Sequence, residues 1–253
     1  MRAYALIPAR SGSKGVPNKN IRKIAGHPLL AYSIAFAKKI GFDRILVSTD
    51  SPEYRDIALA YGAECPFLRS AEASSDTAME EDIFSDLNIN LPKFGIALPD
   101  VWARLKPTNP FRSVPSVKSG IAALSDPKID SVRIISEADA RLWRINSDGF
   151  LEPLLQTWDP VRSIMRRSEF PRVFKPFNLD IFRHAGWVER GSNFMGSRIK
   201  PIVDHKLTGF DIDDFDDFQL VEALISITPR PDFMRPFIHD PVGPLVWDFG
   251  LSR

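Results

Sequence analysis

The chain has 253 residues, of which 44% are hydrophobic and 26% are charged, as is typical of a globular protein with one large core. The formal net charge of +1 excludes a global attraction to nucleic acid or to a membrane surface, so any anion site must be local. Because the single cysteine, Cys65, excludes an internal disulfide and no apolar run reaches the ~20 residues that span a bilayer, we expect a cytoplasmic protein with no membrane or nucleic-acid partner.

Strand-like and helix-like segments alternate over the first 136 residues. Continuous apolar runs predict strands at 3–7, 44–48, 100–105 and 131–136. Helical spacing predicts helices at 28–40 and 51–62, a third after Asp76 and a fourth from about Val114. Pro28 suits a first turn, and Ser51 and Gly62 suit the cap and the stop of the second helix. Strands separated by helices predict an α/β fold with a mostly parallel sheet covered on both faces.

The pattern changes after residue 136. Residues 143–154 predict a hairpin that turns at Ser147-Asp148-Gly149, and 137–176 as a whole predicts a small β-rich inserted subdomain. Residues 178–213 return to strands, and a helix over 216–227 rejoins the core, so the core comprises 1–136 and 177–228. The Pro-rich tail, 229–253, is expected to lie extended on the surface or on a partner subunit.

The loop at 8–20, "PARSGSKGVPNKN", follows the first predicted strand and concentrates cations and glycines. Ligands of open α/β sheets gather where such loops leave the strands. Glycines let backbone N–H groups approach an anion, and lysine and arginine neutralise its charge. A solvated basic loop is the alternative. Since GxxxxGK[ST] and GxGxxG are both absent, the loop predicts a site for a nucleoside triphosphate or another polyphosphate that is neither a P-loop nor a dinucleotide fingerprint.

Five segments in order resemble the motifs of the acylneuraminate cytidylyltransferases, the CMP-sialic acid synthetase family. They are "IPARSGSKGVPNKN" (7–20), "FDRILVSTD" (42–50), "FLRSAEASSDTA" (67–78), "KPTNPFR" (106–112) and "FDIDDFDDF" (210–218). The resemblance implies a Rossmann-like fold, transfer of CMP from CTP to a 2-keto-3-deoxy sugar acid with release of pyrophosphate, and a homodimer formed through the inserted subdomain.

The resemblance also implies roles for individual residues on the nucleotide side. The catalytic residues that hold the triphosphate would be Arg10, Lys14 and Lys19. The other nucleotide-binding residues would be Ala9, Ser11, Gly12, Ser13, Asn20, Arg69, Asp76, Thr77 and Ala78. Alternatively, Asp76 and Thr77 cap the next helix. Glu80 departs from the family pattern, which often has serine there.

On the acceptor side the implied substrate-binding residues are Lys106, Thr108, Asn109, Arg112, Lys175 and Asn178. Lys106 stands where the family usually has glutamine, and this exchange of a neutral amide for an ammonium would suit an acceptor with more negative charge or with fewer hydroxyls. Lys175 stands where the family usually has arginine. Arginines of the inserted segment would reach a neighbouring site in a dimer or form a solvated basic surface; they are Arg162, Arg166, Arg167 and Arg172.

The acidic segment at 210–217 predicts a Mg²⁺ site, because alternation along a strand would put Asp211 and Asp213 on one face. The family pattern supports these two as metal ligands, and Asp50 is a third candidate. The remaining aspartates, Asp214, Asp216 and Asp217, instead suit a helix N-terminus. Together these features predict a Mg²⁺-dependent cytidylyltransferase. The alternatives are an enzyme that uses a different small acid, such as a phosphonate, and a nucleotide-binding regulatory protein without turnover.

Overall fold

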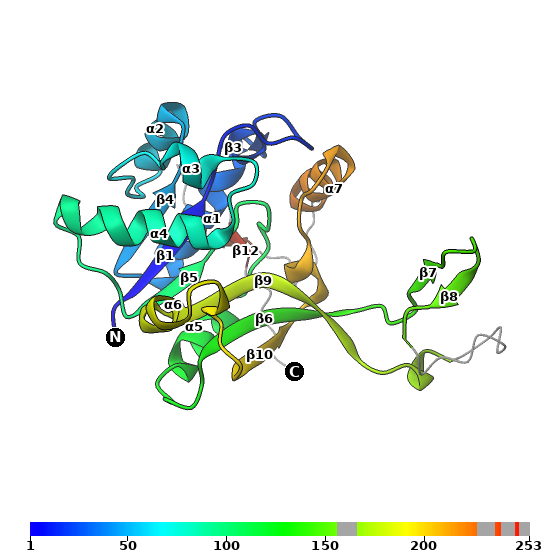
Figure 1. Ribbon diagram of the computed structural model, residues 1–253. Coiled ribbons are helices and arrows are strands. Elements are labelled where there is room, and N and C mark those ends of the chain that lie inside the picture. Colours follow the sequence, from blue (N-terminus) through cyan, green and yellow to red (C-terminus); the bar gives the residue numbers. More distant parts are fainter. Residues whose placement is uncertain (156–165, 227–235, 239–245, 248–253) are drawn as a thin grey trace.

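The computed structural model describes residues 1–155, 166–226, 236–238 and 246–247, and a six-stranded sheet forms its centre (Figure 1). The strands lie in the order β10–β6–β9–β5–β1–β4. Their bounds are β1 Ala3–Pro8, β4 Arg44–Ser48, β5 Val101–Arg104, β6 Ser131–Ala138, β9 Val173–Arg183 and β10 Ile199–Asp204. Strand β9 runs antiparallel to both of its neighbours, and the other strand pairs of this sheet are parallel. The predicted mostly parallel sheet is confirmed.

Helices cover both faces of the sheet. Their bounds are α1 Leu29–Ile40, α2 Pro52–Ala60, α3 Ala71–Ser74, α4 Glu80–Asn90, α5 Val114–Ala123, α6 His184–Arg190 and α7 Phe215–Ser226. Short 3₁₀ turns are η1 Lys19–Ile21, η2 Leu91–Phe94, η3 Arg167–Glu169, η4 Gly191–Asn193 and η5 Lys206–Gly209. The four strands and the helices predicted before residue 136 are all present. None of the helices in the described part of the chain has the length and apolar character of a membrane span.

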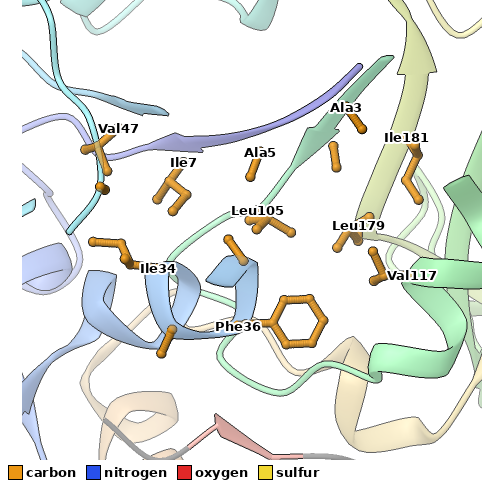
Figure 2. Close-up of a cluster of buried hydrophobic side chains, with 14 of the residues drawn as sticks. Ala3, Ala5, Ile7, Ile34, Phe36, Val47, Leu105, Val117, Leu179 and Ile181 are labelled. Carbon is orange, nitrogen blue, oxygen red and sulfur yellow. The ribbon is translucent and has the colours of Figure 1, made fainter. Parts of the chain in front are cut away.

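Alternation along β1 explains why both faces are buried. Ala3, Ala5 and Ile7 belong to the core cluster that contains α1 and α5, whereas Tyr4 and Leu6 belong to the cluster on the opposite face, with α4. Figure 2 shows the first cluster, where side chains of β1 and β9 lie with Ile34 and Phe36 of α1 and Val117 of α5. The sheet is therefore buried on both faces at β1, whereas the edge strand β10 is largely exposed.

Side-chain caps define the starts of several helices. The hydroxyl of Ser51 accepts a hydrogen bond from the Tyr54 N–H, and α2 ends just before Gly62, whose φ is +78°. Asp214 and Asp217 cap α7 reciprocally, because each carboxylate accepts from the other residue's backbone N–H, at 2.9 and 3.4 Å. The predicted helix-terminal positions of these residues are confirmed. Pro28 differs slightly, since α1 begins at Leu29.

Beyond the sheet, β6 and β9 continue as a two-stranded arm that leads to a hairpin of β7 Trp143–Ile145 and β8 Leu151–Pro153 (Figure 1). The predicted hairpin is confirmed; Gly149, with φ of +85°, lies in its turn. The predicted subdomain boundaries, after 136 and after 176, fall inside β6 and β9. The division into core and inserted subdomain stays a prediction.

The strand prediction for 178–213 is wrong in part. Helix α6 interrupts the segment, and residues 210–213 form no strand. The Ile212 N–H donates to the Thr108 carbonyl, and the Ile212 carbonyl accepts from Lys19 Nζ. Because these backbone groups bond to loops, they are not available for a sheet ladder.

The remaining short strands are β2 Lys23–Ile24 with β3 His27–Pro28, and β11 Pro236–Ile238 with β12 Val246–Trp247. The predicted extended course of the tail at 229–253 otherwise lies outside the described residues.

Candidate active site

A cleft of about 350 Å³ opens where the first loop meets the segments that follow β4 and β5. Strands β1 and β5 are parallel neighbours, so the residues after Pro8 and after Arg104 reach the same edge of the sheet. The lining includes Arg10, Ser13, Lys14, Lys19, Asn20, Arg69, Ala78, Met79, Glu80, Lys106 and Thr108. The structure thus brings together the three predicted catalytic cations and residues of three of the five motifs, 7–20, 67–78 and 106–112.

The cations of the first loop have an acidic partner in the chain itself. The Asp76 carboxylate lies 2.9 Å from Arg10 NH1 and 2.8 Å from Lys14 Nζ. The hydrogen bonds from Lys14 and then Arg10 lower the pKa of Asp76. The alternative that Asp76 and Thr77 cap the next helix is wrong, since α4 begins at Glu80 and Asp82 accepts from the N–H of its cap residue, Met79. A carboxylate therefore occupies the place between two cations that a phosphate would suit.

Lys19 connects the basic loop to the acidic segment. Its Nζ donates to the carbonyls of Ile212 and Asp213, at 2.5 and 3.5 Å. Gly15 also meets this segment, because a Cβ built there would lie 2.2 Å from the Asp213 carbonyl oxygen. The loop and the acidic segment are thus held against each other through backbone atoms.

The two predicted metal ligands lie on that segment. Asp213 is exposed, whereas Asp211 is half-buried and its Oδ1 is buried without a hydrogen-bond partner. No group of three or more metal-ligating side chains occurs among the residues that the structure describes. Asp50 is used elsewhere, because its carboxylate accepts from the N–H and the hydroxyl of Ser11, at 2.7 and 2.5 Å. Burial alone would raise the pKa of Asp50, but the bonds from Ser11 hold it below the usual value.

The other nucleotide-side residues shape the cleft and its rim. Arg69 is 6% exposed and donates to Oγ and O of Ser48, and burial lowers the pKa of Arg69 to about 10. The Asn20 side chain donates to the Arg10 carbonyl at 3.0 Å. Of the remaining residues, Ser13 and Ala78 line the cleft, whereas Ala9, Ser11, Gly12 and Thr77 lie outside its lining.

Only part of the predicted acceptor set reaches the cleft. Lys106 and Thr108 line it. Asn109, Arg112 and Asn178 are 2–3% exposed and lie in a polar cluster around Thr208, behind the site. Their side chains bond within the fold, to the carbonyls of Thr208 and Lys106 and to the Thr208 hydroxyl, and burial lowers the pKa of Arg112 to about 9. Lys175 is exposed on β9 opposite Ser136, in the arm.

The arginines of the inserted segment are only partly described. Arg172 pairs with Glu137 at 3.2 Å, and Arg166 is exposed. Arg162 and the side chain of Arg167 lie outside the described residues. The expectation that these arginines reach a neighbouring site in a dimer stays a prediction.

A buried charge network behind the cleft was missed by the sequence reasoning. Asp180, 1% exposed, accepts from Arg104 and Arg133, and Arg104 also forms an ion pair with Glu80. The available signal was the presence of an arginine and an aspartate inside two otherwise apolar strands, "VWAR" and "NLDIF". Charged residues there need a buried partner.

Comparison with known proteins supports the family that the motifs indicated. A family model described as cytidylyltransferase matches residues 4–134. The CMP-N,N'-diacetyllegionaminic acid synthase of Legionella pneumophila is 30% identical over 233 residues, which are 90% of this chain and 97% of that protein. The N-acylneuraminate cytidylyltransferase of Streptococcus agalactiae is 30% identical over 228 residues, 86% of this chain and 52% of that protein.

Solved structures show the same fold. A CMP:2-keto-3-deoxy-manno-octonic acid synthetase, solved with CTP, superimposes with a TM-score of 0.64 at 17% identity and covers 89% of this chain and 99% of its own. The 4-diphosphocytidyl-2C-methyl-D-erythritol synthase of Anaerococcus prevotii gives a TM-score of 0.61 at 15% identity, with the same two coverages. With the matching family model and a relative aligned over nearly its full length, the chain belongs to the cytidylyltransferase family, and its motifs are those of the acylneuraminate enzymes.

Proposed function

We propose that this chain transfers CMP from CTP to a 2-keto-3-deoxy sugar acid, with release of pyrophosphate and dependence on Mg²⁺. The observation that carries the proposal is the convergence of Arg10, Lys14 and Lys19 at one cleft with Arg69 and Lys106. In this reaction an acceptor oxygen attacks the α-phosphorus and loses its proton, and the bond from that phosphorus to the bridging oxygen of pyrophosphate breaks. Cations already in place stabilise the charge that develops on the leaving group.

The triphosphate would replace Asp76 as the partner of Arg10 and Lys14. Asp76 is more than half exposed, so it leaves these cations without the cost of exposing a buried charge. Lys14 is our candidate for the α-phosphate side, with Arg10 and Lys19 as clamps. Buried Arg69, held by Ser48, would offer a fixed guanidinium to the cytosine acceptors O2 and N3.

Asp211 and Asp213 suit Mg²⁺ in chemistry, because this ion prefers oxygen ligands and usually binds through one or two carboxylates together with substrate phosphates. The Oδ1 of Asp211 is buried without a hydrogen-bond partner, which suits a metal ligand. When bound, the ion would neutralise phosphate charge. Lys19 holds the backbone between the two carboxylates and so positions them next to the basic loop.

The names of the relatives supply the acceptor class. The aligned proteins are called synthases or cytidylyltransferases of N,N'-diacetyllegionaminic acid and N-acylneuraminate, which are nonulosonic acids. All share the 2-keto-3-deoxy acid group, with a carboxylate next to the anomeric carbon. We propose an acceptor of this class.

We also propose a homodimer formed through the arm. Its two-stranded hairpin exposes large apolar side chains, with Ile145 at 72%, Phe150 at 70% and Leu151 at 67%. Such a hairpin is marginally stable alone and needs a hydrophobic face to be covered. A second copy of the chain would provide that cover.

The test is pyrophosphate release with Mg²⁺ and each of the four nucleoside triphosphates, against a panel of nonulosonic acids, other 2-keto-3-deoxy acids and small phosphonates. We expect release with CTP and a sugar acid. Lys14→Ala and Asp211→Asn should each lower kcat by at least 10²-fold at an unchanged unfolding temperature, in line with the loss of one transition-state contact. Lys128→Ala, an exposed lysine outside the cleft, is the matched control.

The outcomes separate the alternatives. Release with CTP and only a phosphonate would keep the chemistry and change the acceptor. CTP binding with no release for any acceptor would favour a regulatory protein. Near-normal rates in the Lys14 or Asp211 variant would show that the role given to that residue is wrong.

A further inference from the structure

The buried charge network lies directly behind the wall of the cleft. In the sheet register Asp180 of β9 stands opposite Arg104 of β5 on one side and Arg133 of β6 on the other. Its carboxylate accepts from Arg104 NH2 and from Arg133 Nε, each at 2.7 Å. One edge of the Arg104 guanidinium is therefore locked in place, and its NH1 is left for another partner.

Glu80, the first residue of α4, is that partner. Its carboxylate forms an ion pair with Arg104 NH1. The Glu80 side chain is 41% exposed and lines the cleft, whereas Arg104 is 3% exposed and does not. Glu80 also lines a second hollow of about 390 Å³, with Met79, Glu81 and Phe194. Glu80 thus covers Arg104 and stands between two open spaces.

Charge within this group of four is balanced only while Glu80 stays in place. Two guanidinium groups then face two carboxylates, and without Glu80 both guanidinium groups share Asp180, with Asp211 as a more distant carboxylate near Arg104. A buried excess of positive charge is costly. Any movement of Glu80 that opens the path to Arg104 therefore needs a replacement anion, and a carboxylate has the matching shape.

We propose that Arg104 binds the carboxylate of the acceptor, which takes the place of the Glu80 carboxylate on NH1. This inference rests on the proposed function and names the subsite that makes the enzyme select acids. The exchange is carboxylate for carboxylate, so the buried charge stays paired throughout. Lys106, two residues beyond Arg104 and in the cleft wall, adds a second cation near the incoming acid, and the second hollow offers room for the rest of the sugar.

The test compares an acid with its uncharged form. The acceptors are N,N'-diacetyllegionaminic acid and its methyl ester, and the variants are Glu80→Gln, Arg104→Met and the control Glu72→Gln, which removes an exposed carboxylate of α3 that lines neither hollow. Glu80→Gln should lower the KM of the acid about threefold to fivefold, because the partly exposed Glu80 carboxylate no longer competes with the acid for Arg104. KM for CTP and for the ester should stay within about twofold.

Arg104→Met should raise the KM of the acid about 10- to 100-fold, the range for a lost hydrogen bond to a charged group, and should affect the ester much less. If the Arg104→Met protein does not fold, the KM values of Glu80→Gln for the acid and the ester test the inference by themselves. Equal changes for acid and ester, or equal effects of Glu80→Gln and Glu72→Gln, would overturn the inference.

Calorimetric titration of the acid into CTP-saturated protein without Mg²⁺ keeps this result separate from turnover. Tighter binding by Glu80→Gln than by the parent in this titration, together with no pyrophosphate release by either protein in the assay with Mg²⁺, would uphold the carboxylate site and reject the proposed reaction. Turnover without the Glu80 effect would reject the site and uphold the reaction. If no protein binds the acid, the carboxylate site is wrong.

Discussion

At the scale of single residues, the burial of a charged side chain distinguishes residues that stabilise the fold from residues that face the cleft. Asp180 is 1% exposed and bonds two arginines across three adjacent strands. Asp76 is more than half exposed and also bonds two cations, Arg10 and Lys14. A buried carboxylate between guanidinium groups cannot leave without depriving these buried cations of their partner. An exposed carboxylate exchanges readily with another anion.

Asp180→Asn should therefore lower the free energy of unfolding by about 3 kcal/mol, because Arg104 and Arg133 would keep their charges without the shared partner. Urea denaturation followed by circular dichroism measures the change. The control is Asp56→Asn, whose ion pair with Arg55 is on the surface, and it should cost less than about 0.5 kcal/mol. Equal stability of the two variants would contradict a structural role for the Asp180 pair.

At the scale of elements, the site depends on the apposition of the first loop and the segment before α7. Lys19 bonds the carbonyls of this segment, and Gly15 lies against it with no room for a Cβ. The reciprocal cap of Asp214 and Asp217 fixes the start of α7 directly after the predicted metal ligands. Loop, acidic segment and helix thus form one unit at the edge of the sheet.

Gly15→Ala should disturb this unit, because the new Cβ would lie 2.2 Å from the Asp213 carbonyl oxygen and both partners are backbone. We expect kcat/KM for CTP to fall at least tenfold, measured by pyrophosphate release. Gly26→Ala serves for comparison, since Gly26 has φ of +87° and open space around its Cβ position. That variant should show only local strain of about 1 kcal/mol and normal kinetics. Unchanged kinetics in Gly15→Ala would argue against a role of the close approach.

At the scale of the whole molecule, the arm carries apolar side chains that the core around the sheet does not cover. It carries the β7–β8 hairpin away from the sheet (Figure 1), with apolar side chains on the outside. Apolar side chains that gather on the surface of a globular protein usually mark a site of contact with another molecule. A partner copy is the proposed cover.

Light scattering coupled to gel filtration should give twice the chain mass of 28.5 kDa. Leu151→Lys should shift the protein towards the monomer, because it places a charge in the buried part of the proposed interface. Leu59→Lys, at an exposed leucine of α2, should leave the mass unchanged. A monomeric parent protein, or an unchanged mass for Leu151→Lys, would contradict the arm-mediated dimer.

Local signals in the sequence were sufficient for the order of strands and helices before residue 136, the cap at Ser51, the hairpin near Gly149 and the family. Periodicity, capping and motif order all act over a few residues, and the motifs also named Arg10, Lys14, Lys19 and Arg69, which the cleft unites. The burial of Asn109, Arg112 and Asn178 could not be predicted in this way. These residues fit an acceptor motif, yet each bonds within the fold.

Other features were decided only by tertiary structure. Residues 210–213 read as a strand, but their backbone bonds to Lys19 and Thr108, about a hundred or more positions away. The partners of Arg104, Glu80 and Asp180, lie 24 and 76 positions away in the chain. The sequence by itself therefore determined the fold class and the nucleotide motifs, because these depend on neighbouring residues. Only the folded chain decided which charges are buried and which face the cleft, because burial and pairing depend on segments that meet after folding.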